Sequence, residues 1–308
     1  MKLVLFLKDG QPPHRKNYQA LSRMCQSCSI EYEETTDYDR LKRADYDMLM
    51  STTSYVCPED IPSSIKIIQG PHFFVFPNDV LIGEENPAYD NRCVYNCLSE
   101  WNRNAFYECS SSYRMKLVTF PFSVNTDYFK PYDQCYDPIF DCILYIKHRS
   151  KALENQAIKL LEAKNLRYHV FRYGSYKEED YMYGIRMSKF MIVLDGHESQ
   201  GFALEEAMSC NVPLLVVDAS SMYDETDDSG TTFIYEHLKP KKLLATSVPY
   251  WSEECGIKIS NPSNLSDAID VMMRIYKSFT PRKYILRTLS DKVCMERMLH
   301  YFNLNITL

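Results

Sequence analysis

The chain has 308 residues, is 45% hydrophobic, and carries a formal net charge of −6 from 41 acidic and 35 basic side chains. The length suits two domains of ordinary size. The acidic balance, with no stripe of Lys and Arg, excludes a nucleic-acid-binding surface and nucleic-acid partners. No apolar run is long enough to span a membrane, and residues 1–7 are too short for a signal sequence. Eleven scattered cysteines favour buried thiols in a reducing compartment, so we expect a cytoplasmic protein.

Along the first part of the chain, short hydrophobic runs alternate with segments in which apolar residues recur at helical intervals. This alternation indicates a small β/α domain. The predicted strands cover residues 2–7, 30–34, 48–51, 65–68 and 73–76, and the predicted helices cover 15–27, 38–44 and 94–109.

The second part of the chain repeats the alternation after a passage rich in proline, at 117–131. Strands are predicted at 142–146, 168–171, 190–194, 213–217 and 257–259, and helices at 152–163, 181–187, 269–276 and 283–301. Short, continuous apolar runs are typical of strands in a parallel sheet that is buried on both faces. The pattern therefore predicts a second doubly wound domain.

The region from 190 to 217 predicts one βαβ unit, with helical spacing in the sequence between the two strands. The first strand ends at Asp195, and a loop with Gly201 opens directly into the helix. Ligands collect at this edge of open α/β sheets. Gly201 lets the backbone approach an anion, and the free N–H groups of the helix start favour a diphosphate. Glu206, in the helix, can accept bonds from both hydroxyls of a ribose, while Glu198 can reach the transferred sugar or the leaving group.

This run resembles the Glu-x7-Glu signature of GT-B glycosyltransferases, in particular the class that includes glycogen synthases and lipopolysaccharide or mannosyl transferases. Glu198, Glu206 and Gly201 match the two glutamates and the glycine of the signature, and Ser199, Gln200 and Phe202 complete the donor-binding loop. The sequence Glu-Ser-Gln-Gly, rather than Glu-Ser-Phe-Gly, more closely resembles the motif of glycosyltransferases from large algal and amoebal DNA viruses. Residues 117–131 independently resemble the passage that closes the N-terminal domain of these enzymes.

The resemblance implies an α/β protein of the GT-B fold, with two Rossmann-like doubly wound domains that face each other across a cleft. Residues 1–134 would form the N-terminal, acceptor-side domain and residues 135–280 the domain that binds the nucleotide sugar. Residues 281–308 would form a helical segment that crosses back and packs on the N-terminal domain.

The resemblance also places cations for the diphosphate after the first strand of the second domain. Lys147 and Arg149, ahead of Lys151, are the candidates, although the Gly-Arg of the family is missing here. Arg binds phosphate in a bidentate manner, and Lys supplies a movable point charge. The alternative is a solvated cationic loop. Tyr173, at the end of another strand, is the candidate for holding the base, with a half-buried structural aromatic as the alternative.

His72 follows the strand at 65–68 and is the candidate general base or sugar contact from the first domain. The alternative is a structural histidine in a loop. His14 is the next choice, in a loop that has only Gly10 where many relatives carry two glycines. The Asp-Tyr-Asp triplets at 37–39 and 45–47 resemble a metal-binding motif of the other major glycosyltransferase fold, but they lie beside predicted helices, where Asp is a good cap. We therefore expect no metal and no cofactor.

These features together predict a hexosyl- or pentosyltransferase. It would move a sugar from a UDP- or GDP-sugar to a hydroxyl of a glycan, glycoprotein or other glycoconjugate acceptor. The first alternative is a noncatalytic module that binds nucleotide sugars or acts as a scaffold in the same fold. A sugar-phosphate epimerase of this fold is a third possibility, which the form of the glutamate motif disfavours.

Overall fold

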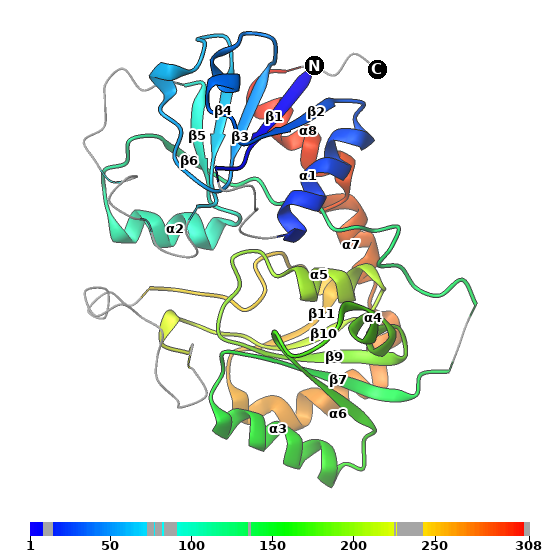
Figure 1. Cartoon of the computed structure of the whole chain (residues 1–308). Coiled ribbons are helices and arrows are strands. Elements are labelled where there is room, and N and C mark those ends of the chain that lie inside the picture. Colours follow the sequence, from blue (N-terminus) through cyan, green and yellow to red (C-terminus); the bar gives the residue numbers. More distant parts are fainter. Residues whose placement is uncertain are drawn as a thin grey trace. The chain divides into compact units, whose positions relative to one another are not determined.

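The computed structural model describes residues 1–8, 15–72, 77, 82, 91–134, 137–224, 226 and 243–304. The chain forms two compact units (Figure 1). The first contains Met1–Ser123 and the chain from Leu289 onward, and the second contains Val124–Thr288. The first boundary between the units thus falls between Ser123 and Val124, whereas the sequence predicted it after residue 134. The second boundary, between Thr288 and Leu289, falls inside the predicted C-terminal segment 281–308.

A six-stranded, wholly parallel sheet organises the first unit, in the order β2-β1-β3-β4-β5-β6. Its strands are β1 (Lys2–Phe6), β2 (Glu31–Thr35), β3 (Met48–Ser51), β4 (Lys66–Gln69), β5 (Cys93–Asn96) and β6 (Lys116–Val118). Its α-helices are α1 (Arg15–Ser27), α2 (Glu100–Cys109) and α8 (Asp291–Tyr301).

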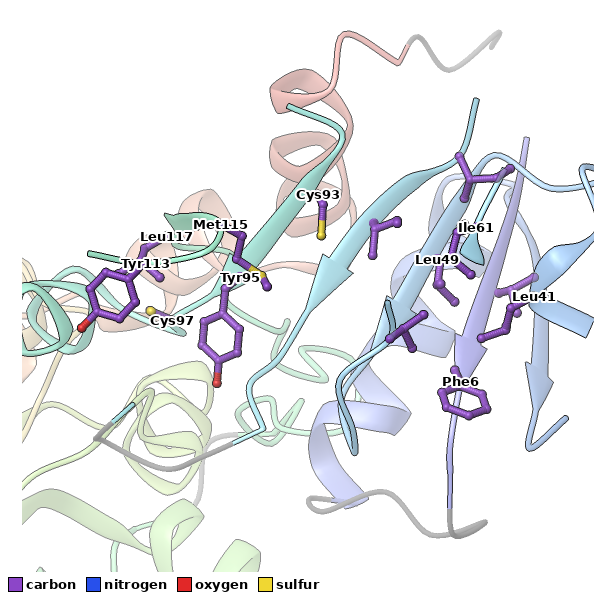
Figure 2. Packing of buried hydrophobic residues seen from close by; sticks show 14 of the residues in the cluster. Phe6, Leu41, Leu49, Ile61, Cys93, Tyr95, Cys97, Tyr113, Met115 and Leu117 are labelled. Carbon is purple, nitrogen blue, oxygen red and sulfur yellow. The ribbon is translucent and has the colours of Figure 1, made fainter. Parts of the chain in front are cut away.

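Side chains on one face of this sheet form its main core. Phe6 of β1 contributes to it together with Leu49 and Tyr95 (Figure 2). Val4 of β1 belongs to the same cluster. Leu3, the residue between Lys2 and Val4, is also buried and points to the opposite face, as the period of two in a strand requires. Helix α1 packs against α8, so the C-terminal helix returns to the first unit.

A five-stranded, wholly parallel sheet organises the second unit, in the order β11-β10-β9-β7-β8. Its strands are β7 (Phe140–Lys147), β8 (Tyr168–Arg172), β9 (Ser188–Asp195), β10 (Leu214–Val217) and β11 (Gly256–Ile259). Its α-helices are α3 (Lys151–Ala163), α4 (Glu178–Arg186), α5 (Phe202–Ser209), α6 (Leu265–Ile275) and α7 (Pro281–Thr288).

Helices cover both faces of this second sheet, which makes the unit doubly wound (Figure 1). Leu144 of β7 belongs to a cluster with Leu161 of α3 and Ile269 of α6. The next residue along β7, Tyr145, points to the other face, where its ring lies 6.4 Å from that of Tyr181 in α4. The continuous apolar runs of the sequence therefore reflect strands buried from two sides.

Three predicted helices differ from the structure. The one predicted at 38–44 is a 3-10 helix of four residues, Asp39–Lys42. The predicted helix at 94–109 is wrong in its first part, because Cys93–Asn96 is strand β5 and the helix begins at Glu100. A buried run with Val94 and Tyr95 suits a central strand, and Ser99, which directly precedes the helix, is extended. The predicted helix at 283–301 is two helices, α7 and α8. The predicted strand at 73–76 lies outside the described residues.

Candidate functional site

Charged side chains gather where β7 and β9 end. Lys147 is the last residue of β7, Asp195 is the last residue of β9, and the two are paired in the register of the sheet. Both strands are parallel, so their carboxyl ends lie at the same edge, which is where open α/β sheets bind ligands. The sheet therefore brings together residues that are 48 positions apart at the edge where a ligand is expected.

Lys147 and Glu198 form a largely buried ion pair at this edge. The Nζ of Lys147 lies 2.7 Å from Oε1 of Glu198, and their side chains are only 13% and 12% exposed. The same Nζ lies 4.6 Å from the centre of the Tyr173 ring. Burial lowers the pKa of Lys147, but the carboxylates of Glu198 and Asp195 outweigh it and raise the pKa above its ordinary value. Lys147 is therefore a fixed cation, enclosed by an aromatic face and a carboxylate.

The loop from Glu198 to α5 has a backbone that only glycine readily adopts. Gly201, directly before α5, has a φ of +96°, and a Cβ there would lie 3.4 Å from the Cβ of Glu198. The N–H of Glu198 donates to the carbonyl of Thr246 at 3.1 Å, so a second loop holds this one in place. Ser199 and Phe202 are half-buried.

The two neighbouring glutamates of α5 have different surroundings. Glu205 accepts a bond of 3.0 Å from the amide of Gln200, which is itself buried. Glu206 is 3% exposed and lies near the phenols of Tyr176 and Tyr181. Burial raises the pKa of both phenols, and the negative charge of Glu206 raises it further. Glu205 thus stabilises the loop that contains Gln200, while Glu206 lies beside the two tyrosines.

Of the three predicted cations, two lie beside Asp195. Arg149 is 9% exposed, and its Nη1 donates to the main-chain carbonyl of Asp195 at 3.3 Å. Burial lowers the pKa of Arg149, against the opposing effect of nearby carboxylates. Lys151 is different: it lies in α3, its side chain is 62% exposed, and it pairs with Glu154 at 2.6 Å. Tyr173 is 54% exposed and leaves much of its ring accessible.

A set of polar residues that was not predicted from the sequence fixes the loop around Thr246. Asp218 directly follows β10, and its Oδ1 accepts from Thr246 Oγ1 at 2.8 Å and from the N–H of Ser247 at 2.7 Å. The hydroxyl of Ser247 donates to the carbonyl of Asp195 at 2.7 Å. The available signal was an Asp at the end of a buried strand, either as its last residue, Asp195, or directly after it, Asp218.

His72 lies in the first unit, shortly after the end of β4. Its Nε2 lies 2.8 Å from the carbonyl oxygen of Ser51 and 3.1 Å from the N–H of Gly70. Burial lowers the pKa of His72 to about 4, so the ring is neutral at physiological pH. His14 and Gly10, the other candidates in this unit, lie outside the described residues.

Within the described ranges, no group of three or more His, Cys, Asp or Glu side chains could hold a metal ion. In the two Asp-Tyr-Asp triplets, Asp39 pairs with Lys42 at 2.6 Å and Asp45 pairs with Arg40 at 2.8 Å. No helix of the described part of the chain is long and apolar enough to cross a membrane.

Solved structures that resemble the chain over nearly its whole length include glycosyltransferases. The chain is similar to a glycosyltransferase from Rickettsia africae (TM-score 0.56, 12% identity, 98% of each chain covered). It is also similar to the sucrose-phosphate synthase of Thermosynechococcus elongatus (0.54, 10%, 98% of each). A third is the lipopolysaccharide outer core galactosyltransferase WaaB (0.52, 12%, 98% of this chain and 99% of that one). The two parallel-sheet units thus have the GT-B fold, as the sequence predicted.

At the level of sequence, no family model matches the chain, and neither does any curated protein. The identities to the solved structures are too low to carry more than the fold. No known protein found to be similar to the chain supports the resemblance of Glu-Ser-Gln-Gly to viral glycosyltransferases.

Proposed function

We propose that the chain is a glycosyltransferase that moves a hexosyl or pentosyl group from a nucleoside diphosphate sugar to an acceptor hydroxyl. The observation that carries the proposal is the Lys147–Glu198 pair at the carboxyl edge of the second sheet, with Arg149 beside it. A buried cation next to a carboxylate suits a substrate that has a diphosphate on one side and sugar hydroxyls on the other.

Each part of such a donor has a candidate partner within the second unit. Lys147 and Arg149 would neutralise the diphosphate, helped by the free N–H groups where α5 begins after Gly201. Glu206 would hold the ribose, and Glu198 the transferred sugar or the leaving group. The exposed ring of Tyr173 would stack on the base.

Transfer of the sugar places negative charge on the departing diphosphate, and fixed cations that do not have to reorganise stabilise that charge. The buried positions of Lys147 and Arg149 meet this requirement. The low pKa of His72 makes its ring a weak base near neutral pH, so we propose a neutral hydrogen-bonding role for it toward the acceptor or the sugar. The acceptor is proposed to be a glycan or glycoconjugate, and the reaction to need no metal.

The second candidate is a noncatalytic nucleotide-sugar-binding module. The ion pair between Lys147 and Glu198 favours it in one respect: in this structure each group neutralises the other. A binding module would be stabilised by nucleotide sugars without consuming them, which separates the two candidates.

The test is to incubate the protein with UDP-, GDP- and ADP-sugars and to measure both the melting temperature and the release of nucleotide. We expect stabilisation by one base class and slow hydrolysis of its sugar. Glu206→Ala should weaken binding of that nucleoside diphosphate by about 10- to 100-fold, because it removes hydrogen bonds to a charged acceptor. Glu162→Ala, an exposed glutamate of α3, is the matched control. No response to any donor would refute the proposal.

A further inference from the structure

Asp195 is a fully buried carboxyl group at the centre of the proposed donor site. It is 0% exposed and is paired in register with Lys147. Its Oδ1 accepts the N–H of His197 at 3.1 Å. Its main-chain carbonyl accepts from Arg149 and from Ser247, at 3.3 and 2.7 Å. The backbone and one carboxyl oxygen of Asp195 are therefore held from several sides.

The second carboxyl oxygen is different. Oδ2 of Asp195 is buried and accepts no hydrogen bond from any donor among the described residues. The carboxyl of Glu198 comes from the loop that follows Asp195 and lies against Lys147, the register partner of Asp195. Its negative charge raises the pKa of Asp195. Two carboxyl groups can hydrogen-bond to each other only when one of them carries a proton, because an ionised carboxylate has no donor. A buried oxygen without a partner would cost folding free energy, and a proton between the two groups removes that cost.

The charged and titratable groups around Asp195 come from three directions. They are Lys147 and Tyr145 of β7, Arg149 of the loop that follows β7, and His197 and Glu198 of the loop that follows Asp195 itself. Burial raises the pKa of Asp195, Lys147 lowers it, and Glu198 raises it again; the net effect is a pKa well above the ordinary value. The adjacent ammonium group of Lys147 is already paired with Glu198.

We propose that Asp195 is a positioning residue of the donor site, whose protonated carboxyl donates a hydrogen bond to Glu198 and fixes Glu198 against Lys147. Glu198 is then held by a cation on one side and by an acid on the other. The role of Asp195 in donor binding rests on the proposed function. The protonation of Asp195 is a property of the free protein and does not depend on that function.

The proton also sets the charge that a donor meets. With Asp195 protonated, Lys147 is paired with one carboxylate, Glu198, and Arg149 lies near the carboxylates of Asp224 and Asp218. Loss of the proton adds one more negative charge beside both cations, which weakens their attraction for a diphosphate. The affinity for a nucleoside diphosphate should therefore fall as the pH rises through the pKa of Asp195.

The experiment compares Asp195→Asn with Asp195→Ala. The amide of Asn can donate to Glu198 as the protonated acid does, and it cannot ionise. We expect Asp195→Asn to bind UDP, GDP or ADP, whichever the wild type binds, within about twofold of the wild type at neutral pH, and Asp195→Ala to bind about tenfold more weakly. At alkaline pH the wild type should lose affinity relative to Asp195→Asn. Weak binding by Asp195→Asn, equal to that of Asp195→Ala, would overturn the proposal.

Asp141→Asn is the matched control, because Asp141 lies near the opposite end of β7. Burial raises the pKa of Asp141, but hydrogen bonds from Lys189 and Arg167 prevail and lower it to about 2. This variant should leave the pH dependence of nucleotide binding unchanged. It should also lose stability relative to the wild type as the pH rises above about 2, while Asp195→Asn should gain relative to the wild type above about pH 4.

Infrared spectroscopy of the nucleotide-free protein keeps this test independent of the proposed function. We expect a carbonyl band of a protonated carboxylic acid at neutral pH, present in the wild type and in Asp141→Asn and lost in Asp195→Asn. The band without any nucleotide binding would support the proton and refute the donor site. Nucleotide binding without the band would support the donor site and overturn the inference.

Discussion

Removal of the Lys147 ammonium group tests whether the ion pair with Glu198 stabilises the second unit. In Lys147→Met the apolar stem remains, but a carboxylate that is 12% exposed loses its cation. Breaking a buried pair by deleting one partner costs about 3–5 kcal/mol, because the remaining charge is left uncompensated. For a unit of this size, each kcal/mol lowers the melting temperature by about 2–4 °C, so we expect a decrease of roughly 6–20 °C.

The assay follows the second unit alone by tryptophan fluorescence. The chain has two tryptophans, Trp101 in α2 of the first unit and Trp251 in the second. A Trp101→Phe background leaves Trp251 as the reporter of the second unit. In this background each variant is unfolded by heat, for the melting temperature, and in urea, for the free energy of unfolding.

A double-mutant cycle then isolates the pair itself. Glu198→Gln alone should cost less than Lys147→Met, since removal of the Glu198 charge lets Asp195 ionise more readily and compensate Lys147. The double variant should be more stable than the sum of the two single effects by about 1–3 kcal/mol. Additive effects, with a coupling below about 0.5 kcal/mol, would refute the reasoning, because they would mean that solvent screens the pair.

Two further predictions concern a backbone position and a histidine. A Cβ at Gly256 would lie 2.0 Å from the carbonyl oxygen of Leu214, so Gly256→Ala should cost about 3–5 kcal/mol in the same urea assay. Gly174→Ala, where φ is also positive but the space is open, should cost only about 1 kcal/mol, and equal costs would contradict the steric explanation. Because the pKa of His72 is lowered to about 4 from 6.5, the unfolded chain binds more protons in this range, and the first unit should lose about 1 kcal/mol per pH unit on acidification from about 6.5 to 4. His72→Gln, followed through Trp101 in a Trp251→Phe background, should remove that slope; an unchanged slope would assign it to other groups.

The order of elements was predictable wherever the pattern is local. The predicted helix at 15–27 and the strand at 48–51 coincide with α1 and β3, because helical spacing and short apolar runs lie within a few residues. Strand β5 was not predicted because only three residues separate its end from the start of α2. The apolar residues of the strand therefore read as the first turn of the helix.

The site was only partly predictable, for a reason of distance along the chain. Lys147 and Glu198 could be nominated from strand ends and from the motif. Their direct pairing depends on the register of β7 against β9, which no local pattern contains. The same holds for Asp195, which was visible only as the end of a strand, and for Ser247, which reaches Asp195 from 52 residues away.

The return of α8 to the first unit makes that unit discontinuous in sequence, whereas the second unit is one uninterrupted stretch, Val124–Thr288. During synthesis the ribosome therefore completes the second unit before it has made the last helix of the first. Since domains generally fold as units, the proposed nucleotide-sugar half can form while the N-terminal half still lacks α8. A deletion that removes α8 would then damage the first unit, whose other helices and strands are made before the second unit.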